Sequence, residues 1–376
     1  MILTMEEEFS VSKTCPLLSI CIPVYNGGDY IVTVMHALLS QSVSHRDRVE
    51  IVVADDASSD NTEHLIRSEF GCEIRYIRNS PNLGMSPNIV KCLTEHARGT
   101  YVWIWSQHCL LHPGALDRVV SAIQQHRELD AFYVNFNCAN YPEDWPKSEE
   151  EAASPKFQYR CTDDTSSRQV PSWRKLLRRD SGYCTQTYAH ILRASLARDY
   201  WHGTVVGRDF TNAKDTFAQS CTVAESVFNR PAFYIGEPVF TIYNGAQTWS
   251  SLEQRSRVYL MAFPDLVAIF QRHGLDGQEL RDAQAYAASK ALGVIAEMLV
   301  SPNAPNRSRI PRFLLKYGTY QGVLAGFVAI FVASKCNWLA RLLYSVSSLS
   351  SRLYQYAFRN CRPARWYRGW RQGRSA

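Results

Sequence analysis

The first part of the chain alternates short apolar runs with amphipathic segments. Apolar or alternating runs of strand length predict five strands, at residues 17–24, 49–54, 73–78, 100–105 and 131–136. Between these runs, apolar residues recur at helical spacing, which predicts helices over 29–40, 61–69, 85–97 and 113–126. Short connections between alternating strands and helices favour parallel pairing, with helices on both faces of one sheet. The pattern therefore predicts an α/β domain with a mostly parallel, Rossmann-like sheet.

The second part of the chain has a weaker pattern. Residues 138–170 are polar and irregular, which is typical of a long surface loop or a domain linker. Shorter helical or strand-like segments follow at 172–179, 193–200, 214–229 and 232–242, and residues 252–300 are mostly helical.

These segments suggest two regions. We expect one domain over 1–250, with a first half over 17–137 and a second half over 171–250. A helical C-terminal region with a basic end would then cover 251–376.

Charge is unevenly distributed along the chain. The 41 Lys and Arg against 35 Asp and Glu give a net charge of +6, but no acidic residue follows Glu297. Residues 298–376 hold 13 basic residues, and Arg recurs at every third position from Arg359 to Arg374, with aromatic residues between. This composition favours an anionic membrane surface. Nucleic-acid binding and a solvated basic end are the alternatives, and we expect no nucleic-acid partner.

Three further features bear on location. The apolar run at 322–333 has 12 residues, which is too short to span a bilayer that needs about 20. The 11 cysteines are scattered, odd in number and lack a Cys-x-x-Cys pair, so we expect free thiols in a reducing cytosol. Residues 1–14 are acidic and have no apolar core, unlike a secretory signal. We therefore expect a cytoplasmic protein; no feature defines its oligomeric state.

Candidate chemistry lies in the loops that follow the strands, because ligands of parallel sheets bind beyond the carboxyl ends of the strands. Asp55 and Asp56 end the second predicted strand. A carboxylate there can accept a hydrogen bond from the imide of uracil or thymine, or from ribose hydroxyls. The alternative is a carboxylate that serves only the turn or the following helix N-terminus.

Four motifs occur in order along the first third of the chain. Pro23-Val24-Tyr25-Asn26 follows the first strand, and Asp55-Asp56-Ala57-Ser58-Ser59-Asp60-Asn61-Thr62 follows the second. Asn82-Leu83-Gly84 follows the third, and Pro113-Gly114-Ala115-Leu116 opens a later helix. This succession, over roughly residues 17–125, resembles the family 2 glycosyltransferases of GT-A fold, in particular O-antigen and abequosyltransferase-like bacterial sugar transferases. The family pattern has Gly where this chain has Ala57.

The resemblance implies a nucleotide-sugar donor, UDP- or dTDP-linked, with residues 17–137 as the nucleotide-sugar-binding half and residues 171–250 as the acceptor-binding half. It also implies inverting transfer of the sugar by single displacement to a hydroxyl of a lipid-linked or polysaccharide acceptor. The residues that it places around the donor are Pro23, Tyr25, Asn26, Asp55, Asp56, Asn82, Gly84, Asn88, Ser106 and Gln107. Within this set, Pro23 and Tyr25 would line the base and Asp56 would contact it.

The largest departure from the family pattern is at the metal-binding loop. The family's Asp-x-Asp-Asp falls on Ser106-Gln107-His108-Cys109, so every expected carboxylate is missing. Three interpretations remain open. His108 can hold Mn²⁺ or, less suitably, Mg²⁺; it can contact the diphosphate directly without a metal; or the loop has lost catalysis. The last would make the chain a nucleotide-sugar-binding or assembly partner in surface glycan synthesis.

The resemblance also implies a carboxylate base in the second half of the chain. Asp215 opens the helix predicted over 215–229 and is our candidate, with Asp209 as competitor. Candidate acceptor contacts are Tyr243, Asn244 and Trp249. The acceptor that the resemblance implies is a lipid-linked glycan at the cytoplasmic face of the inner membrane, where the basic end would hold the protein peripherally.

Overall fold

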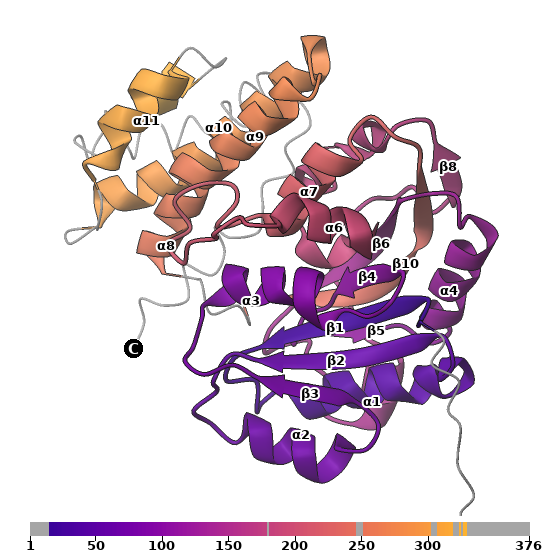
Figure 1. The fold of residues 1–376 in the computed structure, drawn as a ribbon. Helices are drawn as coiled ribbons and strands as arrows, with labels where there is room; N and C mark the ends of the chain where they lie inside the picture. The colour runs from indigo at the N-terminus through magenta and orange to yellow at the C-terminus, as the bar shows by residue number, and fades with distance from the viewer. Residues whose placement is uncertain are drawn as a thin grey trace, which may run out of the picture.

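A computed structural model describes residues 15–178, 180–245, 251–301, 307–318, 323, 324 and 326–328. These residues form one ten-stranded sheet with helices packed around it, and a group of helices beyond it (Figure 1). The strands are β1 (Leu18–Val24), β2 (Val49–Asp55), β3 (Arg75–Arg78), β4 (Tyr101–Ile104), β5 (Cys109–Leu111), β6 (Ala131–Asn140), β7 (Tyr159–Arg160), β8 (Arg168–Val170), β9 (His190–Arg193) and β10 (Ala232–Asn244). All five predicted strands are present, as β1, β2, β3, β4 and β6.

The sheet order is β3-β2-β1-β4-β9-β6-β10-β5, with β7 paired to β6 and β8 paired to β10. The first four strands of this order are parallel, as the sequence predicts. β9 then pairs antiparallel with both β4 and β6, whereas β10 runs parallel to β6. Because β9 reverses direction between β4 and β6, those two strands run the same way. The carboxyl ends of β1, β2, β3, β4, β6 and β10 therefore share one edge.

Helices cover both faces of the parallel strands. α1 (Ile31–Ser42), α2 (Thr62–Phe70) and α4 (Ala115–Gln125) share a core with Ile20 and Ile22 of β1. On the other face, α3 (Met85–Lys91), its π-helical continuation to His96 and α6 (Ala194–Trp201) pack against Cys21. Successive side chains of a strand point to opposite faces, so β1, which is apolar except for the buried Ser19, fills both cores. This explains why the buried strands lack a simple alternation of polar and apolar residues.

Two predicted segments differ from the structure. Residues 138–170 are not a linker, because they contain the end of β6, the short helix α5 (Glu149–Ala153), and strands β7 and β8. These strands are two and three residues long and largely exposed, so they leave no periodic signal. The helix predicted over 215–229 is α7 (Ala218–Ser226), which begins later than expected. Asp215 therefore lies in the turn before α7 and not at its first residue.

The C-terminal region is helical, as predicted. It comprises α8 (Leu252–Arg257), a π-helical segment (Val258–Ala262), α9 (Phe263–Arg272), α10 (Gly277–Val300) and α11 (Arg309–Tyr317). Within the described part of the chain, no helix combines the length and apolar character needed to cross a membrane. The nine cysteines of that part are all free and seven are buried, in agreement with the predicted thiols. Trp249 and the basic end from residue 329 lie outside the described residues.

Candidate active site

Asp55 ends β2 and is completely buried, with its carboxylate fully engaged by the protein. It accepts hydrogen bonds from the backbone N–H (2.9 Å) and hydroxyl (2.6 Å) of Ser58. The hydroxyl of Tyr76 also donates to it at 2.5 Å, and the guanidinium of Arg78 pairs with it. Burial, together with this hydrogen bond to Asp55, raises the pKa of Tyr76. Asp55 therefore holds Ser58, Tyr76 and Arg78 together at the end of β2, and neither of its carboxylate oxygens is left for a ligand.

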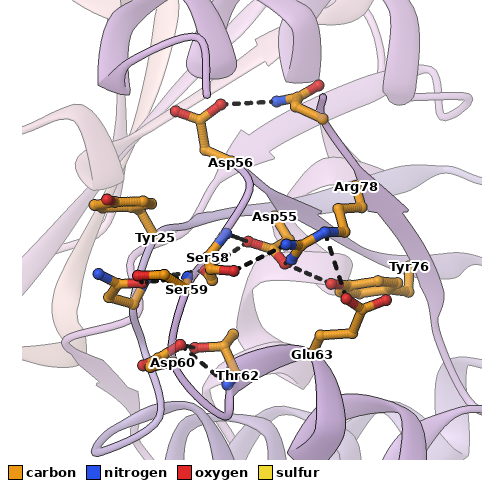
Figure 2. Close-up of polar contacts among 12 residues, drawn as sticks. Tyr25, Asp55, Asp56, Ser58, Ser59, Asp60, Thr62, Glu63, Tyr76 and Arg78 are labelled. Atoms are coloured by element: carbon orange, nitrogen blue, oxygen red, sulfur yellow. Dashed lines mark hydrogen bonds and ion pairs between the residues drawn. The ribbon is translucent and has the colours of Figure 1, made fainter. Parts of the chain in front are cut away.

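The neighbouring carboxylate of Asp56 points the other way, as Figure 2 shows. Asp56 is 2% exposed and accepts from the backbone N–H groups of Leu83 (2.8 Å) and Gly84 (2.7 Å) and from the amide of Asn79 (3.1 Å). Its carbonyl oxygen accepts from the side chain of Asn82 at 2.6 Å. In this structure Asp56 clamps the turn between β3 and α3, at the position where the sequence predicts a base contact.

The loop after β1 is joined to the loop after β2 by side-chain hydrogen bonds to backbone. The N–H of Asn26 donates to the hydroxyl of Ser58 at 2.9 Å, and the N–H of Gly27 donates to that of Thr62 at 2.8 Å. In return, the side-chain oxygen of Asn26 accepts from the N–H of Ser59 at 2.8 Å. These bonds fix the two loops that carry the first two motifs as one unit.

Ala57 adopts a left-handed backbone conformation with φ +60° at the centre of this unit. A residue with a Cβ atom pays roughly 1–2 kcal/mol for that conformation, and glycine does not. The turn thus explains why the pattern that this chain resembles has Gly at this position.

Tyr25 directly follows β1, in which Pro23 is half-buried, and its side chain is exposed at this edge, at 43%. Its backbone N–H donates to the side-chain oxygen of Gln107 at 3.1 Å, and its carbonyl accepts from the Gln107 amide at 3.4 Å. The turn after β4 therefore holds Tyr25 in place, and the ring is left free to stack on a planar ligand.

Asn88, another predicted donor residue, is 2% exposed, and its amide group is used internally. Its side-chain oxygen accepts from Asn79 at 2.9 Å, and its nitrogen donates to the carbonyl of Ala54 at 2.9 Å. Asn88 thus ties α3 to the end of β2.

Arg208 is a residue of this edge that the sequence does not reveal. Its Nη2 donates to the side-chain oxygen of Asn82 at 2.8 Å. A Cβ atom placed on Gly84 would lie 2.9 Å from the Nε of Arg208, so the guanidinium stem crosses directly over this glycine. Gly84 itself has φ +92°, a conformation that glycine adopts readily. The Gly207-Arg208-Asp209 segment thus reaches the predicted donor edge from a distant part of the chain.

His108 lies in the turn between β4 and β5 and packs edge-on against the ring of Tyr30, with centroids 4.7 Å apart. Burial lowers the pKa of His108 to about 4, so its imidazole is neutral at pH 7. The amide nitrogen of Gln107 lies 3.2 Å from its Nε2, which acts as the acceptor of this contact. At pH 7 the neutral imidazole would therefore contact a diphosphate as a hydrogen-bond donor and not as a cation.

The donor set around His108 does not fit a divalent metal. Among the described residues, no group of three or more His, Cys, Asp and Glu side chains is arranged to hold an ion. Cys109 is fully buried, and burial raises its pKa well above the usual value, so it stays a thiol and not a thiolate ligand. Ser106 is buried and its hydroxyl accepts from the N–H of His108 at 3.1 Å. A single neutral imidazole is left where the family pattern supplies carboxylates.

The two candidate bases differ in their surroundings. The carboxylate of Asp215 is largely buried and accepts from the N–H of Gly207 (2.7 Å) and the amide of Asn212 (2.6 Å). Its carbonyl accepts from the hydroxyl of Ser86 at the start of α3. Asp209 is 75% exposed and pairs with Arg257 at 3.7 Å. Asp215 therefore closes the loop that displays Asp209 and Arg208.

Of the acceptor candidates, Tyr243 is 1% exposed and lies against Trp145, with ring centroids 4.8 Å apart. This burial leaves Tyr243 little surface for an acceptor. The half-buried Asn244 ends β10, and its carbonyl accepts from the N–H of Tyr141 at 2.7 Å. Trp145 and Tyr141 both pack against Tyr30, which in turn contacts His108. An aromatic cluster of Tyr30, Tyr141, Trp145 and Tyr243 thus encloses the loop where carboxylates were expected.

The sheet order defines an α/β domain. Its polar loops lie at the carboxyl ends of the parallel strands, where such sheets bind ligands. Residues 19–183 match the model of the glycosyl transferase family 2 domain. This region therefore belongs to glycosyl transferase family 2, and the chain carries a glycosyltransferase domain, as the motifs predict.

Two relatives have similar sequences over short regions. An uncharacterised protein of Mycobacterium tuberculosis is 39% identical over 107 residues, which are 28% of this chain and 32% of that protein. Abequosyltransferase RfbV of Salmonella typhimurium is 37% identical over 92 residues, 24% of this chain and 27% of that enzyme. The chain thus spans a third or less of the length of these relatives.

The fold is similar to that of a solved structure. TarS 1–349 of S. aureus, in complex with UDP-GlcNAc, aligns over 85% of this chain and 91% of its own, with 14% identity and a TM-score of 0.50. This likeness confirms the predicted GT-A type fold.

Proposed function

We propose that this chain transfers a sugar from a nucleoside diphosphate sugar, UDP- or dTDP-linked, to a hydroxyl of a polysaccharide or lipid-linked acceptor. The carrying observation is the family 2 domain, whose motif loops converge on one edge around the free ring of Tyr25. Tyr25 stacks on the base. Asp56 shapes the base site by holding the turn at Leu83 and Gly84, whose N–H groups it binds.

The transfer that we propose inverts the anomeric carbon in a single displacement. It needs a carboxylate that accepts the proton of the acceptor hydroxyl, and the Gly207–Asp215 loop supplies two. Asp215 has both oxygens bound within the loop, which favours a positioning role, whereas Asp209 is 75% exposed and pairs with Arg257 through one oxygen, so its other oxygen can meet an acceptor.

Two isosteric variants test this assignment. Loss of a general base lowers kcat by about 100- to 10,000-fold. We expect Asp209→Asn to do so without a change in thermal stability. Asp215→Asn should lower stability, because one of its two acceptor oxygens, each of which holds a hydrogen bond, becomes an NH2 donor. A large kcat loss in a fully stable Asp215→Asn protein would return the role of base to Asp215.

The acceptor that we propose is a surface glycan under assembly at the cytoplasmic face of the inner membrane. The relative named abequosyltransferase supports a glycan acceptor. On the described part of the C-terminal region, Leu315 of α11 is 88% exposed beside Arg312 and Lys316, and Leu324 and Val328 are 59% and 51% exposed. Apolar side chains among basic ones suit an anionic bilayer surface.

Vesicle sedimentation tests the membrane contact. The full chain should sediment with phosphatidylglycerol vesicles but not with phosphatidylcholine vesicles, and added salt should release it. Leu315→Asp should weaken this binding, whereas the matched Val205→Asp, at an apolar residue that is 93% exposed on the first region, should not. Equal binding to both vesicle types would contradict the proposal.

The loop at 106–109 favours a second candidate, a family member that binds nucleotide-sugar without transferring it. The observation behind it is the absence of a metal-binding group among the described residues. A radiolabelled donor separates the two. If the donor binds tightly but is neither hydrolysed nor transferred, the chain is a binding protein and not an enzyme.

A further inference from the structure

A nucleoside diphosphate leaving group brings a charge that the site must balance. The bond between the anomeric carbon and the β-phosphate oxygen breaks as the acceptor oxygen attacks, so the electron pair stays on the diphosphate. In metal-dependent transfer a bound cation meets this charge. The loop at Ser106–Cys109 offers only a neutral imidazole and a buried thiol. On the proposed function, the compensating charge must come from elsewhere in the site.

Most cationic side chains near the candidate donor edge are already paired. Arg78 is bound to the buried carboxylate of Asp55, and Lys91 pairs with Glu95 at 3.7 Å. Arg257 pairs with Glu253 at 2.6 Å and lies 3.7 Å from Asp209. These groups have anionic partners that would have to be given up before they could bind a phosphate.

Among the described residues, Arg208 has no such partner. It is exposed, and within the part of the chain that the structure describes no carboxylate lies within ion-pair distance of its guanidinium. Its one hydrogen-bond partner there is the neutral side-chain oxygen of Asn82, at 2.8 Å. That bond holds one nitrogen of a group with five N–H donors, so the others remain for a ligand.

The side chain of Arg208 is exposed, but contacts with the Asn82–Gly84 turn fix its position. The side chain crosses Gly84, where any Cβ atom would lie 2.9 Å from its Nε. The N–H of Gly84 donates to the carboxylate of Asp56, and the side chain of Asn82 donates to the backbone carbonyl of Asp56. Arg208 thus sits on the turn that Asp56 clamps, beside the end of β2, where the motif order puts the nucleotide.

We propose that Arg208 binds the diphosphate of the donor and takes the place of a divalent metal in this chain. The guanidinium donates two hydrogen bonds to the phosphate oxygens, a geometry that arginine suits well. During transfer it stabilises the negative charge that the departing nucleoside diphosphate gains, while the acceptor proton passes to a carboxylate of the Gly207–Asp215 loop. Transfer is then independent of divalent ions.

This proposal rests on the proposed function, and calorimetric titration separates the two. Wild-type protein is titrated with UDP, dTDP, GDP, CDP and ADP and with the matching nucleosides, in EDTA and in Mn²⁺. We expect at least one diphosphate to bind equally well in both buffers. Arg208→Gln should weaken that diphosphate at least about tenfold and leave the nucleoside unchanged. Arg208→Lys should recover part of the loss.

Arg281→Gln is the matched control, since Arg281 is exposed on α10 and bonds only to Gln278 in the described structure. A purely structural role of Arg208 would weaken nucleoside and diphosphate together, which would overturn the proposal. So would diphosphate binding that disappears in EDTA. If the wild-type protein binds none of these nucleotides, the proposed function itself is wrong and the role of Arg208 falls with it.

Discussion

Replacement of Asp56 by Asn separates a turn clamp from a direct base contact. The carboxylate accepts three hydrogen bonds, from the N–H groups of Leu83 and Gly84 and from the Asn79 amide. Asn keeps the shape but replaces one acceptor oxygen with a donor. At least one buried N–H then faces another donor. A buried hydrogen bond to a charged group contributes about 1.5–3 kcal/mol, so we expect the free energy of unfolding to fall by about 2 kcal/mol.

Urea unfolding monitored by circular dichroism measures this loss, and calorimetry with UDP and dTDP measures binding on the same samples. Asp47→Asn is the control, because that side chain is 74% exposed and its one polar contact among the described residues is with Arg48, at 3.2 Å. The clamp predicts that stability and nucleotide affinity fall together in Asp56→Asn. Lost nucleotide binding with unchanged stability would refute this reasoning and show that the carboxylate meets the base directly.

Three further predictions concern the stability of the same domain. Burial lowers the pKa of three histidines to about 4, namely His108, His112 and His190. Each of these histidines binds a proton more readily when the chain is unfolded, so the free energy of unfolding should fall as pH drops from about 6.5 to about 4, with uptake of up to about three protons. Urea titrations across this pH range measure the fall. A free energy of unfolding that stays constant with pH would contradict the burial of these side chains. Ala57→Gly should be neutral or stabilise by up to about 1 kcal/mol, because it relieves a φ of +60°; a clear loss in urea unfolding would show that this turn carries no strain. Tyr76→Phe removes a donor to a buried carboxylate and should cost about 1.5 kcal/mol; unchanged unfolding would mean that the remaining donors suffice.

The parallel half of the fold could be predicted because its strands are long apolar runs separated by helices of clear periodicity. β9 could not, since His190–Arg193 is four residues long and carries no alternation. The late start of α7 was missed because the side chain of Asn212 and the backbone of Asp215 bind each other at 3.0 Å, a local turn that competes with the helix.

The candidate donor edge can be predicted where its residues follow strand ends, as at Tyr25, Asp56 and Asn82. Their partners could not be predicted, because the carboxylate of Asp56 meets its donors only once β3 lies beside β2. Arg208 carries no local signal, and its contact with Asn82 spans 126 residues of sequence.

The contact between His108 and Tyr30 could not be predicted either, because it too depends on the tertiary fold. Only the fold brings the helix after β1 against the turn after β4, and only then does burial hold the imidazole neutral.

The most direct test of the proposed function is donor turnover by the full chain. Radiolabelled UDP-, dTDP-, GDP- and CDP-sugars are incubated with it in EDTA, with and without an extract of bacterial lipid-linked glycans. Release or transfer of sugar from at least one donor, faster by at least about 100-fold than for Asp209→Asn, is the predicted result. If no donor is bound, hydrolysed or used in either condition, or in added Mn²⁺, the chain is not a sugar transferase.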